Sequence, residues 1–393
     1  MIRLDNERDV IIVGAGAVGS ALCYALALRG LTVAMVDAQP AHTEPSVRTS
    51  ALTNASCQWL STLGLWPHGD LKVAPMSGLQ ILNGNGRGRL RFDSADLGLE
   101  NLGVIVDHAA FETLLRSRAR TAPGAQWHNE AARHVSLHHA HTEVVLASGR
   151  SLRAPLLIAA DGAHSIVRDQ LGVSVWRHDY GQTAICANIQ LGCSHDGVAW
   201  QRFLATGPLA LLPLPDPTQS SLIWSTANLE AEQLRELSER DFNDTLTQAF
   251  GADLGTLQIL SPRAYFPLMA AHAEQYVGSR FALIGDAAHR VHPLAGQGVN
   301  LGFADAQTLV QTLLDGRAKG TDLGSRRLLR QYERSRKGAN LGMLLATDVL
   351  NRAFRHRSPW SEELLTMGLN ITQTLNPLKA FFMNQAGAQP QHQ

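Results

Sequence analysis

The opening of the chain alternates short apolar runs with a glycine-containing turn and a helical pattern. Asp9 to Val13 and Leu31 to Val36 predict two buried strands, and the small residues from Ser20 to Leu28 have helical spacing. Much later, Phe281 to Ile284 is an equally apolar run, and it precedes a long amphipathic pattern from Val299 to Leu314. Strands that alternate with helices in this way predict an α/β domain built on a parallel sheet.

The middle of the chain has a different pattern, with short strands separated by turn residues. The strand-like runs are Thr183–Leu191, Ala199–Leu204, Leu209–Leu212 and Ser220–Thr226, and helical patterns follow at Glu230–Leu237 and Phe242–Phe250. Such spacing predicts a mostly antiparallel sheet crossed by helices. Earlier in the chain, the runs Leu79–Leu82 and Leu90–Phe92 flank alternating glycines, which predicts a hairpin.

The remaining segments complete a domain map. We expect helices at Arg48–Leu63 and Ala109–Ala119, a hairpin at Val135–Leu146, a strand at Ala154–Ala160, and helices from Ser325 to about Ala386. The cofactor domain is thus split, with a substrate domain inserted into it. The predicted ranges are 1–75, 107–180 and 271–324 for the α/β domain, 76–106 and 181–270 for the substrate domain, and 325–393 for the C-terminal helices.

Composition narrows the class of protein. The 393 residues are 45% hydrophobic and 17% charged with a formal net charge of zero, which is typical of a globular protein and disfavours a nucleic-acid partner. The four cysteines form no CxxC pattern, so we expect structural thiols rather than disulfides or a metal site. The charged start, MIRLDNERDV, does not resemble a signal peptide, and no apolar run approaches the length of a membrane-spanning helix. These features predict a cytoplasmic protein.

The first turn carries a dinucleotide-binding pattern. Gly14, Gly16 and Gly19 follow the first strand. Gly14 allows the tight turn, Gly16 lets a pyrophosphate approach the backbone around Ala15 closely, and Gly19 lets the helix pack on the strand. Asp37 ends the second strand, at the spacing of an acid that binds a ribose. The motif alone leaves FAD and NAD open. Because nothing else in the chain repeats it, we predict one dinucleotide site.

A second polar element follows the strand at Phe281–Ile284. Gly285-Asp286 places a carboxylate at the strand's carboxyl end, where open α/β sheets bind their ligands. A loop with Pro293 follows, and then Gly296-Gln297-Gly298 opens the next helix. Free N–H groups at a helix start attract negative charge. The segment therefore predicts a ligand that offers both a hydroxyl and an anionic group.

With these motifs placed, the chain resembles the single-component flavin-dependent aromatic hydroxylases of the para-hydroxybenzoate-hydroxylase-like group. The resemblance rests on Gly14 to Gly19, on ADGAHSIVR (160–168) and on Gly285-Asp286 with its loop. Within that group the chain resembles the ubiquinone-biosynthesis hydroxylases, through the segments RTSALTNAS (48–56), AWQRF (199–203), LPLPDP (212–217), GDAAHRVHPLAGQGVNLGF (285–303), QYERSRK (331–337) and GLNITQTLNPLK (368–379). AWQRF and the DP after LPLP are most similar to the 2-polyprenylphenol 6-hydroxylase type.

The resemblance implies roles for particular residues around FAD. Asp37 would bind the adenosine ribose, Arg48 the phosphate or ribose region, and Asp286 the ribityl or pyrophosphate part. Asp161 and Arg168 would support the cofactor, and the helix start would lie against the flavin. The helix-start positions are Gly296, Gln297, Gly298, Val299 and Asn300. One departure concerns His108, which stands where we expect an Asn, so a cofactor contact there is in doubt.

The resemblance also implies the reaction. NAD(P)H would reduce the FAD, O2 would add to form a flavin C4a-hydroperoxide, and one oxygen would pass to the ring of a lipophilic polyprenylphenol in ubiquinone biosynthesis. Pro293 would form a wall of the reaction chamber. His292 and His289 are candidates for a role near the flavin, but loop histidines whose ring nitrogens bond the backbone explain these positions at least as well. An FAD-dependent prenyl reductase or dehydrogenase and a non-catalytic flavin-binding scaffold remain alternatives, whereas a halogenase is disfavoured because no WxWxIP segment occurs.

Three further groups of residues have more than one interpretation. His134, His138, His139 and His141 lack ligand partners at metal-site spacing, which favours a solvated turn over a metal site. Trp200, Phe203 and Trp224 could line a substrate cavity or pack in the core. The C-terminal helices place basic residues beside apolar ones, which fits peripheral contact with the inner membrane, a surface for other ubiquinone-biosynthesis proteins, or an ordinary solvated face. The basic residues are Arg334, Arg336, Lys337, Arg352, Arg355 and Arg357. A homo-oligomer remains open.

Overall fold

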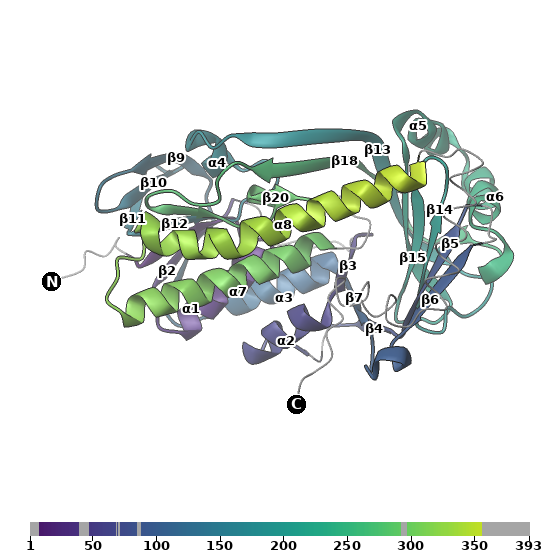
Figure 1. The fold of residues 1–393 in the computed structure, drawn as a ribbon, viewed down its shortest axis with the longest axis horizontal. Helices are drawn as coiled ribbons and strands as arrows, with labels where there is room; N and C mark the ends of the chain where they lie inside the picture. Colours follow the sequence, from purple (N-terminus) through teal and green to yellow (C-terminus); the bar gives the residue numbers. More distant parts are fainter. Residues whose placement is uncertain are drawn as a thin grey trace.

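The computed structural model describes residues 8–38, 47–67, 69, 71–84, 88–291 and 297–355. Four sheets organise this part of the chain. Two of them are large, a parallel five-stranded sheet and a nine-stranded mixed sheet, and two small three-stranded sheets lie beside them. The large sheets occupy opposite ends of the molecule in Figure 1.

The parallel sheet has the strand order of a dinucleotide-binding fold. Its strands are β1 (Val10–Val13), β2 (Val33–Val36), β8 (Ala125–His128), β12 (Leu156–Ala159) and β19 (Phe281–Leu283). They are arranged β19-β12-β1-β2-β8, and every neighbouring pair is parallel. Starting from β1, the chain adds β2 and β8 on one side and then β12 and β19 on the other. The strand order therefore reverses between β1 and β12, and sheets of this type bind ligands at that point. The predicted α/β class is confirmed.

Four long helices pack around this sheet: α1 (Ala17–Leu28), α3 (His108–Arg120), α7 (Gln297–Ala318) and α8 (Arg326–Arg355). Helix α1 contacts both α3 and α7, and α8 lies along α7 (Figure 1). The ring of Phe303 on α7 lies 5.7 Å from Trp59 and 6.0 Å from Phe111. Burial of these aromatic side chains ties α7 to α3 and to the short helix α2 (Asn54–Thr62).

The nine-stranded sheet is mostly antiparallel, as predicted. It contains β5 (Gly78–Asn83), β6 (Arg89–Asp93), β13 (Val175–Gln190), β14 (Val198–Phe203), β15 (Pro208–Pro213), β16 (Gln219–Ala227), β17 (Gln258–Ile259), β18 (Ala264–Ala273) and β20 (His289–Arg290). Only β5 and β14 pair in parallel. The predicted hairpin of β5 and β6 thus extends a sheet formed mainly by residues a hundred positions later.

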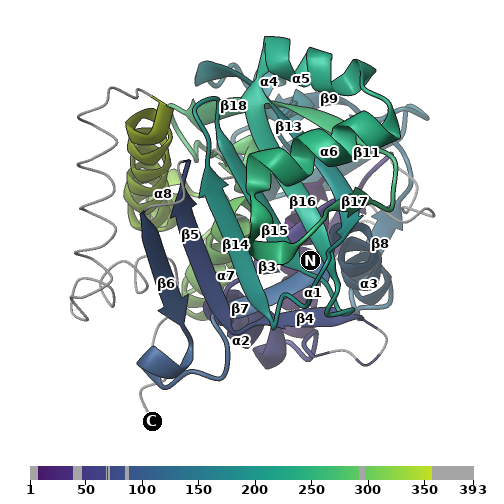
Figure 2. The same cartoon turned by 90° about the vertical axis from the view of Figure 1, so that its right-hand side faces the viewer.

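One face of this sheet is covered by α5 (Asn228–Glu236) and α6 (Glu239–Phe250) (Figure 2). Trp224 packs against Phe242 on this side, and Trp200 packs against Phe250. These two tryptophans therefore belong to the core under the helices and not to a cavity wall. Phe203 is also buried.

Two small three-stranded sheets complete the fold, and one of them contains a segment that we predicted to be helical. They are β3 (Thr49–Leu52), β4 (Val73–Met76) and β7 (Gly103–Asp107), and β9 (Ala132–Leu137), β10 (Thr142–Leu146) and β11 (Ser151–Ala154). The predicted helix from 48 to 63 is in fact strand β3 followed by α2. The strand forms because β7 offers it an antiparallel partner, and the helix starts only after the Thr53 hydroxyl caps its first turn.

Two long strands join the two large sheets. β13 and β18 pair along most of their length and run across the top of the molecule in Figure 1, from the parallel sheet to the antiparallel one. The predicted domain boundaries remain a prediction. Helix α8 confirms the predicted helical C-terminal region up to Arg355, and residues 356–393 lie outside the described part of the chain.

Candidate functional site

The carboxyl ends of the parallel strands bring four of the predicted site elements to one edge of the sheet. Gly14 follows β1, Asp37 follows β2, Asp161 follows β12 and Gly285 follows β19. Backbone hydrogen bonds continue past the strands, from Gly14 N to the Val36 carbonyl (2.9 Å) and from Ile284 N to the Ala159 carbonyl (3.0 Å). These segments, up to 270 residues apart in sequence, therefore start from adjacent positions in space.

The three glycines of the first turn have the geometry that a pyrophosphate site requires. Gly14 has a φ of +102°, and a Cβ there would lie 2.3 Å from the Ala160 carbonyl oxygen. A Cβ at Gly19 would lie 2.0 Å from the Gly14 oxygen, so α1 can pack this closely only without a side chain. At Gly16 a Cβ would meet nothing closer than Glu112 Oε2 at 3.8 Å. The space in front of Gly16 is thus open, and the first N–H groups of α1 have no side-chain cap.

Asp37 is held against this turn by charged residues that the sequence analysis did not single out. Its carboxylate accepts a hydrogen bond from Ala15 N and lies 3.7 Å from the Arg116 guanidinium. Arg116 lies 3.8 Å from Glu112, and Glu112 lies 3.7 Å from His108, so the three polar side chains form a row along α3. The i, i+4, i+8 spacing of these polar residues along one side of the helix was the available signal.

His108, the departure from the expected Asn, is engaged by the protein itself. Its Nδ1 lies 2.8 Å from the Ser50 hydroxyl of β3, and its backbone N–H donates to the Arg48 carbonyl at 3.0 Å. The Arg48 guanidinium lies 5.5 Å above the Phe266 ring of β18. Arg48 therefore lies between the start of α3 and strand β18 of the antiparallel sheet, and its predicted contact with the cofactor stays a prediction.

Asp161 and Arg168 support the turn after β12. The Asp161 carboxylate accepts hydrogen bonds from the Ser165 hydroxyl (2.5 Å) and from Val167 N (3.2 Å) at the start of α4 (Ile166–Gln170). Burial raises the pKa of Asp161, although these hydrogen bonds oppose the shift. Arg168 is only 2% exposed and donates to the Ala287 and Ala163 carbonyls, both at 3.2 Å. It thereby connects this turn to the turn that carries Asp286.

The Gly285-Asp286 turn presents an available carboxylate. Gly285 adopts a φ of +57°, and a Cβ there would lie 3.7 Å from Val18 of α1. Asp286 is exposed, and its side chain has no hydrogen bond or ion pair with the residues that the structure describes. The predicted carboxylate at the strand end therefore faces open space beside the glycine turn.

The start of α7 is open at Gly298, where a Cβ would meet nothing within 4 Å. Asn300 is instead occupied: its Oδ1 accepts from Thr53 N (2.9 Å) and the Ser56 hydroxyl (2.8 Å), and its Nδ2 donates to the Ala51 carbonyl (2.7 Å). This side chain joins α7 to β3 and α2. Val299 is half-buried beside it, whereas His292, Pro293, Gly296 and the Gln297 side chain lie outside the described residues.

Behind the Asp286 turn lies a buried carboxylate that the sequence analysis also missed. Asp305 of α7 is fully buried; its Oδ2 accepts from Gly285 N (3.1 Å) and bonds His289 Nε2 (2.6 Å), and its Oδ1 accepts from Arg336 Nε (2.8 Å) and Asn340 Nδ2 (3.0 Å). Burial raises the pKa of Asp305, but His289 and Arg336 outweigh burial, so the pKa is lowered. His289 is thus satisfied by a carboxylate and not by the backbone, and its Nε2 is not available to a ligand.

The antiparallel sheet turns its uncovered face toward this edge. The Thr49 hydroxyl of β3 bonds the Ser221 hydroxyl of β16 at 3.0 Å, which joins the two parts. Across the sheet, one row of paired residues on this face comprises Cys186, Ile223, Ala210, Gln201 and Ile81. Four of the five are half-buried, and this row combines three aliphatic side chains with a thiol and a carboxamide.

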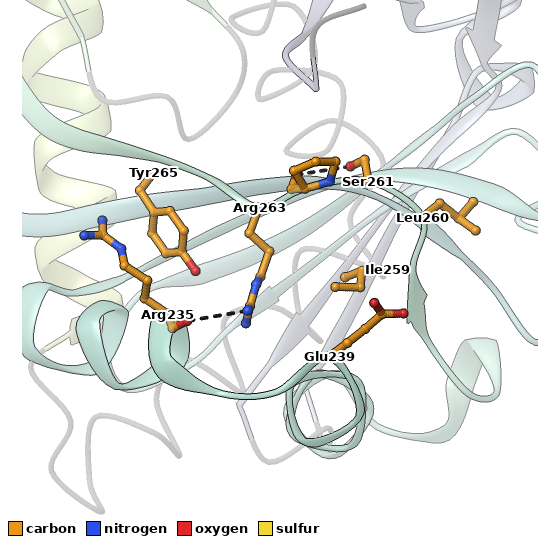
Figure 3. Close-up of a pocket in the computed structure, with 8 residues that line it drawn as sticks. Arg235, Glu239, Ile259, Leu260, Ser261, Arg263 and Tyr265 are labelled. Atoms are coloured by element: carbon orange, nitrogen blue, oxygen red, sulfur yellow. Dashed lines mark hydrogen bonds between the residues drawn. The ribbon is translucent and has the colours of Figure 1, made fainter.

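A separate hollow of about 630 Å³ lies on the opposite, helix-covered side of that sheet (Figure 3). Arg263 there donates to the Leu234 carbonyl (2.8 Å) and the Leu237 carbonyl (2.9 Å) at the end of α5, and the Arg235 guanidinium lies 4.2 Å from the Tyr265 ring centroid. The arginines of this hollow therefore hold the end of α5 in place, and the hollow is not part of the strand-end site.

The thiols and the histidine cluster add no chemistry to the site. Burial raises the pKa of Cys23 and Cys57 to about 12 and that of Cys186 to about 11, and all four cysteines are free thiols. His138 and His141 stack at 4.6 Å, with His138 3.7 Å from Glu143. Within the described ranges, no three His, Cys, Asp or Glu side chains meet in a metal-binding group.

These residues fit an FAD molecule. An open glycine turn at a helix start suits the pyrophosphate, Asp37 and Asp286 suit ribose and ribityl hydroxyls, and the open start of α7 at Gly298 suits the flavin edge. The family described as FAD binding domain matches residues 7–344.

Three proteins that are similar to this chain in sequence or in fold are monooxygenases or hydroxylases by name. The ubiquinone biosynthesis monooxygenase COQ6 of Danio rerio is 33% identical over 437 aligned positions, covering 96% of this chain and 90% of that protein. The ubiquinone hydroxylase UbiL of Rhodospirillum rubrum is 33% identical and covers 97% of this chain and 90% of its own. Among solved structures, p-nitrophenol 4-monooxygenase PnpA of Pseudomonas putida has a TM-score of 0.79 at 19% identity, covering 97% of this chain and 99% of that one.

The fold and the strand-end site therefore define an FAD-dependent monooxygenase. More narrowly, the chain belongs to the family of ubiquinone-biosynthesis hydroxylases that includes COQ6 and UbiL. The resemblance seen in the sequence is confirmed at this level.

Substituting Asp286 tests its predicted contact with the cofactor. Asp286→Ala should weaken FAD binding about 10-fold, because a hydrogen bond to a charged acceptor would be lost. Flavin fluorescence titration of the apoprotein measures the change. Asp315→Ala is the matched control, since Asp315 is an exposed carboxylate on α7 that bonds only Gln311 among its described neighbours. Equal FAD affinity in the two variants would remove Asp286 from the site.

Proposed function

We propose that this enzyme hydroxylates the aromatic ring of a polyprenylphenol in ubiquinone biosynthesis, using NAD(P)H and O2, and that it is of the 2-polyprenylphenol 6-hydroxylase type. One observation carries the proposal. The strand-end site adjoins the face of the antiparallel sheet that α5 and α6 leave uncovered, where Ile223, Ala210 and Ile81 lie in one row, so a cofactor at that edge would have aliphatic side chains opposite it. The names and near full-length similarity of COQ6 and UbiL support the pathway.

The chain's own residues would hold and shield the cofactor. The N–H groups at the start of α1 would bind the pyrophosphate, and those at the start of α7 would favour the negatively charged form of the flavin. When bound, FAD supplies the oxygen activation that side chains cannot provide. Ile223, Ala210 and Ile81 would exclude water from the ring and contact the prenyl tail. Gln201, in the same row, is placed to bond the phenol hydroxyl.

Two other functions remain open to this architecture. A prenyl reductase or dehydrogenase would turn over without oxygen, and a scaffold would bind FAD without oxidising NAD(P)H. The polar Gln201 within the aliphatic row favours a substrate with a hydroxyl-bearing ring over a purely hydrocarbon one.

Purified yellow protein, a short-chain prenylphenol, NAD(P)H and ¹⁸O2 test the proposal. We expect one ¹⁸O atom in the ring of the product, and its position by NMR identifies the hydroxylated carbon. An anaerobic control separates hydroxylation from reduction. Product without ¹⁸O, or turnover that continues without oxygen, would contradict the proposal.

A further inference from the structure

Helix α8 presents an exposed face with two chemically distinct halves. Four arginines, Arg326, Arg327, Arg330 and Arg334, are exposed near its start and line one hollow of about 460 Å³. Arg326, Arg330 and Arg334 recur every fourth residue, so they form one ridge of the helix. The stripe continues toward the other end of α8 with Leu341, Leu345 and Val349, which are 41%, 53% and 63% exposed.

The arginine half has no acidic partner within the described part of the chain. None of the four guanidinium groups forms an ion pair there. The nearby acids are occupied elsewhere: Glu333 accepts a hydrogen bond from Tyr276 N at 2.9 Å, and Asp322 pairs with Arg280 at 2.6 Å. In a protein with zero net charge, this is a local concentration of free positive charge.

Between Gly338 and Val349, the exposed side of the apolar half carries no charged group among the side chains that the structure describes. The exposed positions between Gly338 and Val349 are glycine, alanine, leucine or valine. Added Cβ atoms at Gly338 and Gly342 would meet nothing within 4 Å, so the backbone here is accessible as well. Moving exposed aliphatic side chains from water to an apolar boundary lowers the free energy, so a contiguous group of them favours such a boundary.

The opposite side of this half packs over the proposed substrate chamber. Met343 and Leu344 contact an apolar cluster that includes Ala184, Leu301 and Ile223. Ile223 also belongs to the uncovered row of the antiparallel sheet. Figure 1 shows the end of α8 beside that sheet. One helix therefore separates the chamber from the exposed leucines.

We propose that the exposed face of α8 docks on an anionic phospholipid bilayer, with the arginines on the phosphates and Leu341, Leu345 and Val349 in the acyl boundary. The partner is chosen by complementarity: the arginines without acidic partners match the phosphate layer of a bilayer, and the aliphatic residues that follow them match its hydrocarbon layer. The proposal rests on the proposed function, because a polyprenylphenol dissolves in such a bilayer and would then lie next to the chamber. Of the basic face expected from the sequence, Arg334 belongs to this surface, whereas Arg336 is bound to Asp305 and Lys337 donates to the Glu274 carbonyl. Arg357 and the side chains of Arg352 and Arg355 lie outside the described residues.

Cosedimentation of the holoenzyme with vesicles tests the proposal. We expect binding to vesicles of equal parts phosphatidylglycerol and phosphatidylcholine, and a loss of about 10-fold or more in the triple variant Arg326→Glu, Arg330→Glu, Arg334→Glu. The matched control is Arg133→Glu, Arg177→Glu, Arg240→Glu, which changes net charge equally at three scattered, exposed arginines without ion pairs. The variant Leu341→Ser, Leu345→Ser should also bind several-fold more weakly.

Three results would overturn the proposal. The first is no binding to the anionic vesicles, and the second is an equal loss in the scattered control, which would show an effect of net charge alone. The third is a dimer in solution that Leu341→Ser dissociates while vesicle binding is absent, which would assign the face to a second copy. Hydroxylation of a short-chain phenol without vesicles should be unchanged in every variant, and that assay fails separately if the proposed function is wrong.

Discussion

Replacing Asp305 with alanine should lower the free energy of unfolding by about 3–5 kcal/mol, because removal of one partner leaves buried charges without compensation. His289, Arg336, Asn340 and Gly285 N all direct a hydrogen bond at this one carboxylate. Urea denaturation of the apoprotein measures the loss. In the control Asp315→Ala, removal of an exposed carboxylate from the same helix should cost less than about 0.5 kcal/mol.

The same variant should have a diagnostic pH dependence. The pKa of Asp305 is lowered in the folded protein, so its contribution to stability is complete above the ordinary value of 3.8 and is lost as pH falls through the folded value. The stability difference between wild type and Asp305→Ala should therefore stay constant near neutral pH and shrink only below about pH 4. A difference that shrinks already at pH 6 would contradict this prediction.

Gly16→Val should abolish FAD binding while the apoprotein still folds. The valine side chain would fill the open space in front of the α1 N–H groups, and loss of two hydrogen bonds to phosphate corresponds to about a 100-fold weaker affinity or more. The backbone itself tolerates the change, because Gly16 has a φ of −61° and a Cβ there meets no atom closer than 3.8 Å. The residue caps α1, so a stability loss of about 1 kcal/mol is expected.

Gly19→Val provides the contrast. Its Cβ would lie 2.0 Å from the Gly14 carbonyl oxygen, so this variant should lose stability as well as FAD. Thermal melting of both apoproteins, together with flavin titration, separates the two effects. A yellow Gly16→Val protein with wild-type flavin content would contradict the placement of the pyrophosphate.

The parts of the fold that depend on local pattern could be predicted from the sequence. The glycine turn, Asp37 and the Gly285-Asp286 turn each adjoin an apolar strand, and the parallel order of those strands brings them to one edge. Strand β3 was missed because RTSAL has no strong local preference and becomes a strand only by pairing with β7.

The buried polar groups were not predictable in the same way. In the sequence, Asp305 is one acid in an amphipathic helix. Its partners lie between 16 and 35 residues away in three other segments, the Gly285 turn, β20 and α8. Asn300 could be assigned to the site by resemblance, but the hydrogen bonds to Thr53 and Ser56 depend on a segment almost 250 residues earlier. Such pairings are set by tertiary packing and leave no periodic signal in the sequence.

The bond between Asp305 and α8 has a consequence for how the enzyme can be divided. Arg336 and Asn340 neutralise and bond a carboxylate that also fixes the Gly285 N–H beside Asp286. A chain that stopped before α8 would keep every glycine and acid of the strand-end site, yet the buried Asp305 carboxylate under the Asp286 turn would lose two of its four hydrogen bonds and its arginine partner. The cofactor-binding unit is therefore not modular: its last structural component is encoded some 300 residues after its first.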